Sequence, residues 1–566
     1  MRNAFSTCNY CGCGCGLFLM EKDSRIIGVG PSLSHPVSQG TLCLKGWTSY
    51  QYIHSPSRLT QPLIRKGSNL KEATWEEALS AAAEGLKSAR QKFGPQAIAF
   101  FGAGRATNEE LLLLQYLAEE VIGTRLIFLD SLSHSLSYKD LFDGKVDQAN
   151  IEDIGVSDLL VLVNSDSKEQ HPAFSGQVWK ALDNGTKVLS FYTRRDPLAK
   201  HSQIHLQISP FTEGALLKGL INLYFSDEAS RWGTIPGVNE LREMARDYSP
   251  QRVSQICGIR EDDLRSAFSL LSSARAPVFI YPWGSMEATR EKALIEDLKD
   301  LLMMKGEGGK LAILYPSCNS RGAHLLAKNG IGQDLSQVKV LLLLGEPYGE
   351  DRRAILSLRG RLDLLISLDL FMSPTAEAAD IVFPSSSFAE KAGTFTSTEG
   401  RIQEIIPAID PLRGTRPDAE ILTSLCAQLG AKVPSWEDVR KQVSQILGTP
   451  GPRNSEMRFE AEPVPPPPEL DESFPFTFVG DAVNLRWHTD TRVMKTPILA
   501  RELFENYIEM NLEEFRDLGL REGMTAKFIT RAGEVVAKVR PTEVLKKGTL
   551  LSSYYSLLGP VRVERA

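Results

Sequence analysis

The chain has 566 residues, 42% of them apolar and 24% charged, which is enough for three or four globular domains with large cores. Its formal net charge of −6 and pI near 5.9 argue against a nucleic-acid partner or an anionic membrane surface. No run of 18 uncharged apolar residues occurs, so we expect no membrane span. Because no apolar leader or twin arginine precedes the first cysteines, we expect a cytoplasmic location.

Five of the eight cysteines lie within the first 43 residues. Four have the spacing Cys8-x2-Cys11-x3-Cys15-x27-Cys43, so three thiolates come from a glycine-rich loop and the fourth from farther along the chain. Zinc ribbons pair two C-x2-C knuckles, and the spacing therefore favours a [4Fe-4S] cluster over structural zinc. The fifth thiol, Cys13, is expected to be a bystander, with a ligand role as the alternative.

Lys45 follows the fourth cysteine by two residues. A cation at this place would stabilise a reduced, more negative cluster and could bridge it to a second redox centre. The alternative is an ordinary solvated lysine.

Helices and strands alternate after the cysteine segment. Thr74 and Glu77 form a capping box that predicts a helix to about residue 92, followed by a strand at 97–101 and a helix at 108–122. Further buried strands, with one helix at 174–182, are predicted at 159–163, 187–192, 278–281, 311–315, 340–344, 364–368 and 381–383. These strands fall into two sets. Ligands of open parallel sheets bind at the carboxyl ends of the strands, so we expect a ligand held between two α/β domains.

The composition changes near residue 462. Residues 463–468 read PVPPPP, which predicts an extended linker that cannot join a sheet interior. Short strands with glycine turns at 526–529, 533–540 and 548–554 then predict a small β-barrel.

Ten short stretches resemble the molybdopterin oxidoreductase superfamily, and above all the formate dehydrogenase catalytic (alpha) subunits. They are residues 7–17, 42–46, 62–65, 74–78, 106–110, 171–172, 390–395, 399–403, 416–418 and 518–523. Together these stretches are specific, whereas one alone would not be. The stretch at 399–403 is also similar to the large iron–sulfur subunit of complex I.

The resemblance implies an α/β, multidomain molybdopterin-oxidoreductase architecture with two doubly wound α/β domains. The implied parts are a [4Fe-4S] domain at 1–58, an α/β domain at 59–125 and 335–450, a second α/β domain of pterin-dinucleotide type at 126–334, a proline-rich linker at 451–472, and a C-terminal β-barrel of molybdopterin-dinucleotide-binding type at 473–566. The implied cofactors are the [4Fe-4S] cluster and bis-molybdopterin guanine dinucleotide with molybdenum or tungsten.

In formate dehydrogenases a cysteine or selenocysteine, followed by a histidine, completes the shell of the metal. Here the corresponding pair is Ser133 and His134, and serine is the ligand in some oxygen-atom-transferring relatives. The alternative is that both are ordinary loop residues. The cofactor-binding positions that the resemblance implies are Lys45, His171, Gly345, Glu346, Gly393, Thr394, Arg401, Gln403, His488, Thr489 and Arg492.

The sequence departs from the formate dehydrogenase pattern at further places. No arginine precedes Asn319, where those enzymes hold the formate carboxylate, and Arg321 lies nearby but at a different position. Asp490 adds a carboxylate where an anionic diphosphate would approach, which Arg492 could offset. The Asp-Pro-Arg of the family reads YTRRDP at 192–197, which weakens guanine recognition there.

Two functions remain open at this point. One is an iron–sulfur oxidoreductase subunit, like formate dehydrogenase alpha, which transfers electrons between a molybdenum or tungsten pterin centre and partner redox subunits. The other is a catalytically silent relay or structural subunit, like the large subunit of complex I, with a cluster but neither pterin nor metal. Both imply iron–sulfur or flavin partner subunits in a larger complex.

Overall fold

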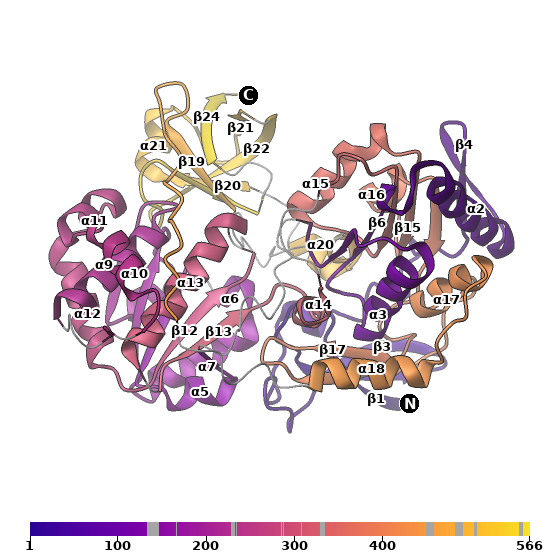
Figure 1. The fold of residues 1–566 in the computed structure, drawn as a ribbon, viewed down its shortest axis with the longest axis horizontal. Helices are drawn as coiled ribbons and strands as arrows, with labels where there is room; N and C mark the ends of the chain where they lie inside the picture. Colours follow the sequence, from indigo (N-terminus) through magenta and orange to yellow (C-terminus); the bar gives the residue numbers. More distant parts are fainter. Residues whose placement is uncertain are drawn as a thin grey trace. The chain divides into compact units, whose positions relative to one another are not determined.

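The computed structural model describes residues 1–132, 146–165, 167–227, 232–233, 235–284, 286, 288–306, 308–328, 334–448, 458–480, 491–502, 507–531, 533–553 and 559–565. The chain forms two compact units, each described by itself (Figure 1). The first comprises Met1–Leu141, Tyr315–Pro450 and His488–Phe504, and the second Phe142–Leu314, Gly451–Trp487 and Glu505–Ala566. No helix in these described ranges is both long and apolar enough to cross a lipid bilayer.

The first unit begins with a small antiparallel sheet that presents the cysteine loop. Its strands, in order, are β1 (Arg2–Thr7), β2 (Gly16–Lys22) and β3 (Arg25–Pro31). Thr7 pairs with Gly16, so residues 8–15 form the loop of the β1–β2 hairpin. Cys43 is the N-cap of the short helix α1 (Leu44–Trp47).

A seven-stranded sheet forms the body of the first unit, in the order β5-β4-β16-β15-β14-β6-β7. The strands are β4 (Leu63–Lys66), β5 (Asn69–Glu72), β6 (Ile98–Gly102), β7 (Ile127–Leu129), β14 (Val340–Leu344), β15 (Leu364–Asp369) and β16 (Ile381–Pro384). The strands from β16 to β7 run parallel, and the chain adds β7 on one side and β15 and β16 on the other. The topological switch therefore lies between β6 and β14. Sequence patterns start the second α/β domain at residue 126, whereas β7 pairs within this sheet.

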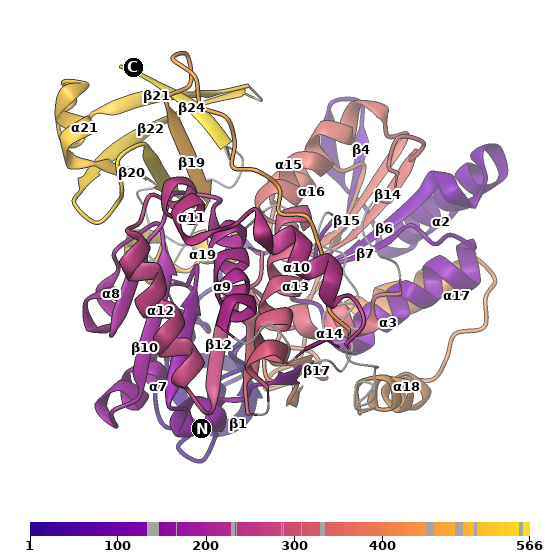
Figure 2. The same cartoon turned by 60° about the vertical axis from the view of Figure 1, so that its left-hand side comes forward.

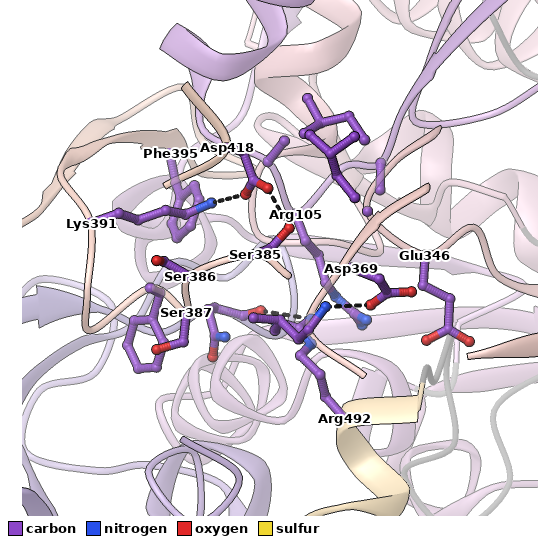
Figure 3. Close-up of a pocket in the computed structure, with 18 residues that line it drawn as sticks. Arg105, Glu346, Asp369, Ser385, Ser386, Ser387, Lys391, Phe395, Asp418 and Arg492 are labelled. Carbon is purple, nitrogen blue, oxygen red and sulfur yellow. Dashed lines mark hydrogen bonds and ion pairs between the residues drawn. The ribbon is translucent and has the colours of Figure 1, made fainter. Parts of the chain in front are cut away.

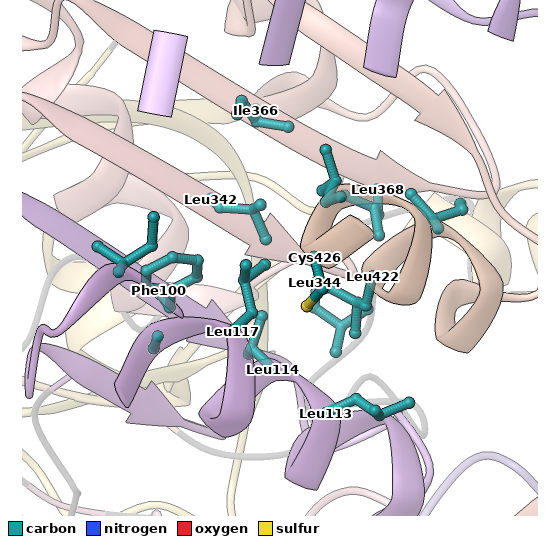
Figure 4. Close-up of a cluster of buried hydrophobic side chains, with 14 of the residues drawn as sticks. Phe100, Leu113, Leu114, Leu117, Leu342, Leu344, Ile366, Leu368, Leu422 and Cys426 are labelled. Atoms are coloured by element: carbon teal, nitrogen blue, oxygen red, sulfur yellow. The ribbon is translucent and has the colours of Figure 1, made fainter. Parts of the chain in front are cut away.

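Helices cover both faces of this sheet. One face carries α2 (Trp75–Phe93), α3 (Asn108–Tyr116), α17 (Asp418–Gln428) and α18 (Trp436–Gly448), and the other carries α15 (Gly349–Leu358) and α16 (Pro374–Ala378). Because side chains alternate along a strand, Leu342 packs toward α3 and α17 while Leu341 packs toward α15. Figure 4 shows the first of these layers, where Leu114 and Leu422 of the two helices meet the strands.

The second unit contains a six-stranded parallel sheet in the order β11-β10-β9-β12-β13-β8. The strands are β8 (Asp147–Gln148), β9 (Leu159–Val163), β10 (Lys187–Tyr192), β11 (Ile204–Gln207), β12 (Pro277–Pro282) and β13 (Lys310–Leu314). The helices of this unit include α7 (Pro172–Asp183), α9 (Glu213–Asp227), α12 (Glu261–Ser273) and α13 (Ala288–Lys305) (Figure 2). The apolar runs that predict β9, β10 and β12 are thus continuous buried strands, as expected for a parallel sheet.

The second unit also holds a closed barrel in the order β19-β23-β20-β22-β21-β24. Its strands are β19 (Phe476–Gly480), β20 (Tyr507–Asn511), β21 (Thr525–Thr530), β22 (Gly533–Thr542), β23 (Thr549–Ser552) and β24 (Gly559–Arg565). The expected architecture of α/β sheets followed by a C-terminal β-barrel is therefore confirmed.

The proline-rich segment is extended and is also hydrogen-bonded to a neighbouring helix. The guanidinium of Arg290, on α13, donates to the carbonyls of Pro465 at 2.8 Å and Pro466 at 2.5 Å. Lys292 forms an ion pair with Glu462 at 2.5 Å. Proline lacks an N–H, but its carbonyl still accepts hydrogen bonds, so residues 458–468 pack along α13.

Residues 491–502 lie in the first unit, although the sequence groups them with the barrel. They form α19 (Thr491–Met494) and α20 (Pro497–Glu502). The guanidinium of Arg492 stands 5.7 Å from the ring centroids of both Tyr10 and Tyr52. These cation–π contacts tie the segment to the cysteine domain.

Candidate cluster site and cofactor pocket

The four cysteines of the predicted cluster set lie near one another in the first unit. Burial, and then the charges of Cys43 and Cys11, raise the pKa of Cys8 well above its usual value. The pKa of Cys15 is also raised well above its usual value, first by burial and then by the charges of Cys8, Cys11 and Cys43. Each thiol thus lies within electrostatic range of the others, and a bound cation centre would relieve their repulsion.

Hydrogen-bond donors surround these sulfurs. The backbone N–H of Tyr10 donates to Cys8, and those of Lys45 and Gly46 donate to Cys43. Such donors stabilise the negative charge of cluster-bound thiolates. Lys45 is buried, and its charge opposes the rise that burial and Cys11 cause in the pKa of Cys43.

Within the described part of the chain, no three His, Cys, Asp or Glu side chains are arranged around a point that could hold a single metal ion. A cubane differs because each of its iron atoms takes one thiolate, so its ligands stand farther apart than those of one zinc ion. The four thiols with their N–H donors fit a [4Fe-4S] cluster.

A hairpin from much later in the sequence clamps the cysteine loop. Its strands are β17 (Gly393–Thr396) and β18 (Ile402–Ile405). The N–H of Thr398 donates to the carbonyl of Gly12 at 2.6 Å, and the amide of Gln403 donates to the carbonyl of Gly14 at 2.8 Å. Arg401 pairs with Glu399 at 2.8 Å within the same hairpin. Of the positions predicted to bind cofactor, Gln403 thus supports the cysteine loop, and Arg401 stabilises the hairpin.

The same hairpin is anchored to the start of α3. Glu109 accepts from the N–H of Thr394 at 2.7 Å, and the amide of Asn108 donates to the hydroxyls of Thr394 and Thr396 at 3.0 Å. Gly393 lies against Thr107, the N-cap of α3. The stretches at 106–110 and 390–395 therefore meet in one buried network.

A buried lysine joins three further segments. Lys391 lies 2.7 Å from Glu110 and 2.8 Å from Asp418, and all three side chains are at most 9% exposed. Asp418 also accepts from the hydroxyl of Ser385 at 2.5 Å. Lys391, Asp418 and Ser385 line a pocket, and Figure 3 shows them at one end of it.

This pocket lies at the topological switch between β6 and β14. Ala103 and Arg105 follow β6, Gly345 and Glu346 follow β14, and Asp369 ends β15, and all five line the pocket. Open α/β sheets bind their ligands at this kind of position. Figure 3 shows the carboxyl groups of Asp369 and Glu346 side by side, with Arg105 and Arg492 close to them.

The pocket mixes both signs of charge. Burial, and then the charge of Glu346, raise the pKa of Asp369 to about 8. A protonated carboxyl can both donate to and accept from a ligand, while Arg105 and Arg492 suit its anionic part. The combination fits a nucleotide, which presents a hydrogen-bonding base and phosphates.

Replacing Asp369 by asparagine should stabilise the cofactor-free chain, and this gain should be larger at pH 8 than at pH 5 by up to about 4 kcal/mol. The folded state holds a proton that the unfolded state, with a pKa of about 3.9, releases, so stability falls as the pH rises toward the folded pKa. Asparagine removes this loss. Thermal unfolding of the wild type and of Asp369→Asn between pH 5 and pH 8 measures this difference. If the stability of both proteins changed with pH in the same way, the expectation would be contradicted.

Glu346 is already engaged by the chain. It accepts from the N–H and hydroxyl of Thr491 at 2.8 and 3.0 Å and pairs with Arg352 at 3.3 Å. It therefore holds α19, and with it Arg492, at the pocket. Of the predicted cofactor positions, Gly345, Glu346 and Arg492 line the pocket.

The segment before Asn319, which lacks the arginine of the formate dehydrogenase pattern, is hydrogen-bonded to the cysteine loop. The carbonyl of Tyr315 accepts from the N–H of Gly12 at 3.1 Å, and the N–H of Tyr315 donates to the hydroxyl of Thr398 at 2.8 Å. Arg321 is 6% exposed and donates to the carbonyl of Thr398 at 2.7 Å. Arg321 thus supports the turn of the β17–β18 hairpin.

Ser133, His134, His488 and Thr489 lie outside the described residues, but the chain before Ser133 is informative. Asp130 is 2% exposed, has a φ of +71°, and accepts from the hydroxyl of Tyr348 at 3.1 Å. Tyr348 in turn lies 3.3 Å from the hydroxyl of Ser317. An aspartate whose backbone adopts the left-handed conformation costs about 1 kcal/mol, so the fold holds this carboxylate in place at an energetic cost.

The second unit has its own polar pocket beside its switch point. Asn164 and Thr193, which follow β9 and β10, line it together with Glu213. Burial raises the pKa of Glu213 to about 7. Arg194, at the altered family motif, pairs with Glu509 at 3.3 Å. His171 is buried at the start of α7 and does not line this pocket.

Sequence reasoning missed Asn9, Arg105, Asp369 and Glu213. Asn9 lies inside the stretch at 7–17, and Arg105 lies directly before the stretch at 106–110, so their place beside recognised residues was a usable signal. Asp369 and Glu213 follow apolar runs as single carboxylates, which is too common a pattern to single them out.

Three family models match the chain. Molybdopterin oxidoreductase matches residues 58–428, the Molybdopterin oxidoreductase Fe4S4 domain matches residues 1–55, and the Molydopterin dinucleotide binding domain matches residues 478–556. The first of these alone spans more than half of the chain.

Individual relatives agree with these matches. The F420-dependent formate dehydrogenase subunit alpha of Methanocaldococcus jannaschii is 29% identical over 638 aligned residues, with 97% of this chain and 94% of that protein covered. A nitrate reductase of Symbiobacterium thermophilum is 25% identical, with 94% and 87% covered. The structure of acetylene hydratase from Pelobacter acetylenicus matches 99% of this chain and 100% of its own, with a TM-score of 0.79 and 15% identity, and shows the same fold. The expected resemblance to formate dehydrogenase-like molybdopterin oxidoreductases is confirmed.

Proposed function

The chain belongs to the molybdopterin oxidoreductase family, and from that premise we propose that it transfers electrons between a pterin-bound molybdenum or tungsten centre and partner redox subunits. The matched domains support a [4Fe-4S] cluster and a molybdopterin dinucleotide as its cofactors. When bound, the metal and pterin supply the redox chemistry on the substrate, and the cluster carries single electrons.

The observation that carries the proposal is the shared wall of the pocket and the cluster loop. Asn9 follows Cys8 directly and also lines the pocket at the switch point. Arg492, another lining residue, lies 3.5 Å from the carbonyl of Asn9. A redox group held in this pocket would stand next to the cluster, as electron transfer requires.

Each group of residues has a definite task in this proposal. Cys8, Cys11, Cys15 and Cys43 hold the cluster, with Lys45 balancing its charge. Asp369 reads the edge of the nucleotide base, and Arg105 and Arg492 neutralise the diphosphate. Ser133 and His134 stay the predicted pair at the metal. The domain division stays a prediction, except that β7 and residues 491–502 belong to the first unit.

The first test is a cofactor count on the purified assembly. We expect about four iron atoms, one molybdenum or tungsten atom and two guanine nucleotides per chain. Asp369→Asn should lower the nucleotide count and leave the iron at the wild-type level, because Asp369 does not contact the cluster sulfurs. Partner subunits that carry iron–sulfur or flavin groups should copurify.

The catalytically silent relay is the competing function. It would give iron near four per chain with neither metal nor pterin, and that result would refute the proposal. The match to a dinucleotide binding domain and the charged pocket at the switch point both favour the enzyme over the relay.

A further inference from the structure

The polar pocket of the second unit has walls from two distant parts of the chain. Asn164, Phe211 and Glu213 line it from the six-stranded sheet and the start of α9, whereas Val479 and Gly480 line it from the end of β19 in the barrel. A large ligand can enter or leave this pocket only if the two walls separate. Contacts that fix β19 against the sheet therefore control the exchange of a ligand.

The segment before β19 is anchored along α13, and we call its residues 458–468 the strap. Phe459 is 1% exposed, and its N–H donates to the carbonyl of Pro236 at 2.9 Å. The N–H of Glu460 donates to the carboxylate of Asp300, on α13, at 3.2 Å. In Figure 1 the orange trace of this segment passes α13 and leads into β19. The strap thus has a fixed start and continues into one wall of the pocket.

Arg290 joins the strap to the opposite wall. Its guanidinium donates to the carbonyls of Pro465 at 2.8 Å and Pro466 at 2.5 Å, and it also lies 5.3 Å from the ring centroid of Phe211. Burial raises the pKa of Glu213 to about 7, and the charge of Arg290 opposes this rise. One side chain therefore contacts both the strap and the wall of the pocket.

Two further features show that the strap fits closely beside the pocket. Phe211 has a φ of +61°, which a bulky residue rarely adopts, so the surrounding packing must hold it there. A β-carbon added at Gly214, the residue after Glu213, would lie 2.6 Å from Cγ1 of Val464 in the strap. The strap therefore packs directly against the backbone that carries Glu213.

We propose that Arg290 is a positioning residue that locks the strap and thereby holds β19 closed over a dinucleotide in this pocket. The inference rests on the proposed function, which supplies the dinucleotide. Prolines offer no N–H, so the carbonyls are the backbone groups by which this part of the strap can be held, and a guanidinium can donate to two of them at once. Opening the strap must break both hydrogen bonds.

The first test follows the loss of guanine nucleotide from the purified assembly after transfer into nucleotide-free buffer. Of the two nucleotides expected per chain, one should leave about tenfold faster in Arg290→Met, because two hydrogen bonds from a charged donor are lost. The second nucleotide and the iron should stay at the wild-type level, since they belong to the first unit. Wild-type release from Arg290→Met would overturn the proposal.

Lys292→Met is the matched control. Lys292 lies on the same helix and pairs with Glu462 of the strap at 2.5 Å, but its side chain is 45% exposed and the pair lies away from the pocket residues. Exposed ion pairs contribute little, so this variant should release nucleotide like the wild type. The same acceleration in both variants would overturn the assignment of the lock to Arg290.

A reversible disulfide separates locking from a general loss of stability. A β-carbon at Gly214 would lie 3.5 Å from Cβ of Val464, a separation that a disulfide spans. When Gly214→Cys and Val464→Cys are added to Arg290→Met, mild oxidation should restore slow release and reduction should reverse it. The same oxidation of Arg290→Met without the cysteine pair should change nothing. Fast release with the disulfide formed would overturn the proposal.

The nucleotide count before release separates the two possible failures. Two nucleotides in the wild type, with no effect of Arg290→Met or of the disulfide, would refute the lock alone. A wild-type assembly without guanine nucleotide would refute the proposed cofactor, and the lock with it.

Discussion

Cys43→Ser should remove most of the cluster iron and lower the stability of the N-terminal sheet. Cys43 is the one predicted ligand outside the β1–β2 loop, and the N–H groups of Lys45 and Gly46 are already directed at its sulfur. A serine oxygen is a harder donor than a thiolate and suits iron–sulfur clusters poorly. Because cluster binding contributes to folding free energy, thermal unfolding should begin at a lower temperature. Iron analysis and the visible absorption of the cluster measure the loss.

Cys426→Ser is the control for this variant. Cys426 is fully buried in the apolar layer between α17 and the sheet, so serine there destabilises the first unit without touching the cluster. It should keep its iron at permissive temperature. Full iron in Cys43→Ser would remove Cys43 from the ligand set.

Lys391→Met should destabilise the first unit by about 3–5 kcal/mol, since it leaves two buried carboxylates without their cation. Lys391 sits between Glu110 and Asp418, and all three side chains are almost completely buried. One carboxyl must then take up a proton at neutral pH, so the loss should shrink as the pH is lowered. Chemical denaturation at pH 5 and pH 8 measures both effects.

Lys328→Met provides the comparison. Lys328 pairs with Glu119 at 2.5 Å in the same unit, but the lysine side chain is 57% exposed. Exposed pairs contribute at most about 1 kcal/mol, so this variant should unfold almost like the wild type. If the two lysine variants lost the same free energy of unfolding, burial of Lys391 with Glu110 and Asp418 would have no energetic consequence.

The strands were the most predictable part of the fold. Leu159–Val163 and Val340–Leu344 are continuous apolar runs, and the structure has strands with these same bounds. A strand buried on both faces needs apolar residues at every position, and so the pattern is strong. β24 is half-exposed and carries charges at Arg562 and Glu564, which leaves no such signal.

The site could be predicted only where the chemistry fixes the spacing. A tight loop that offers three thiolates to one cluster leaves a trace in the sequence, as Cys8, Cys11 and Cys15 do. Asp369 leaves none, because strand order alone brings it to its neighbour Glu346. The role of Arg321 could not be predicted from the sequence either, because its hydrogen-bond partner is a backbone carbonyl.

The clamp on the cysteine loop has a consequence for how the protein is made. Gln403 and Gly14 are 389 positions apart, and synthesis at about 5–20 residues per second separates their appearance by tens of seconds. During that interval the nascent N-terminus has its thiols but not the hairpin that aligns them. The hydrogen bonds that hold Gly12 and Gly14 can therefore form only after translation has passed β18.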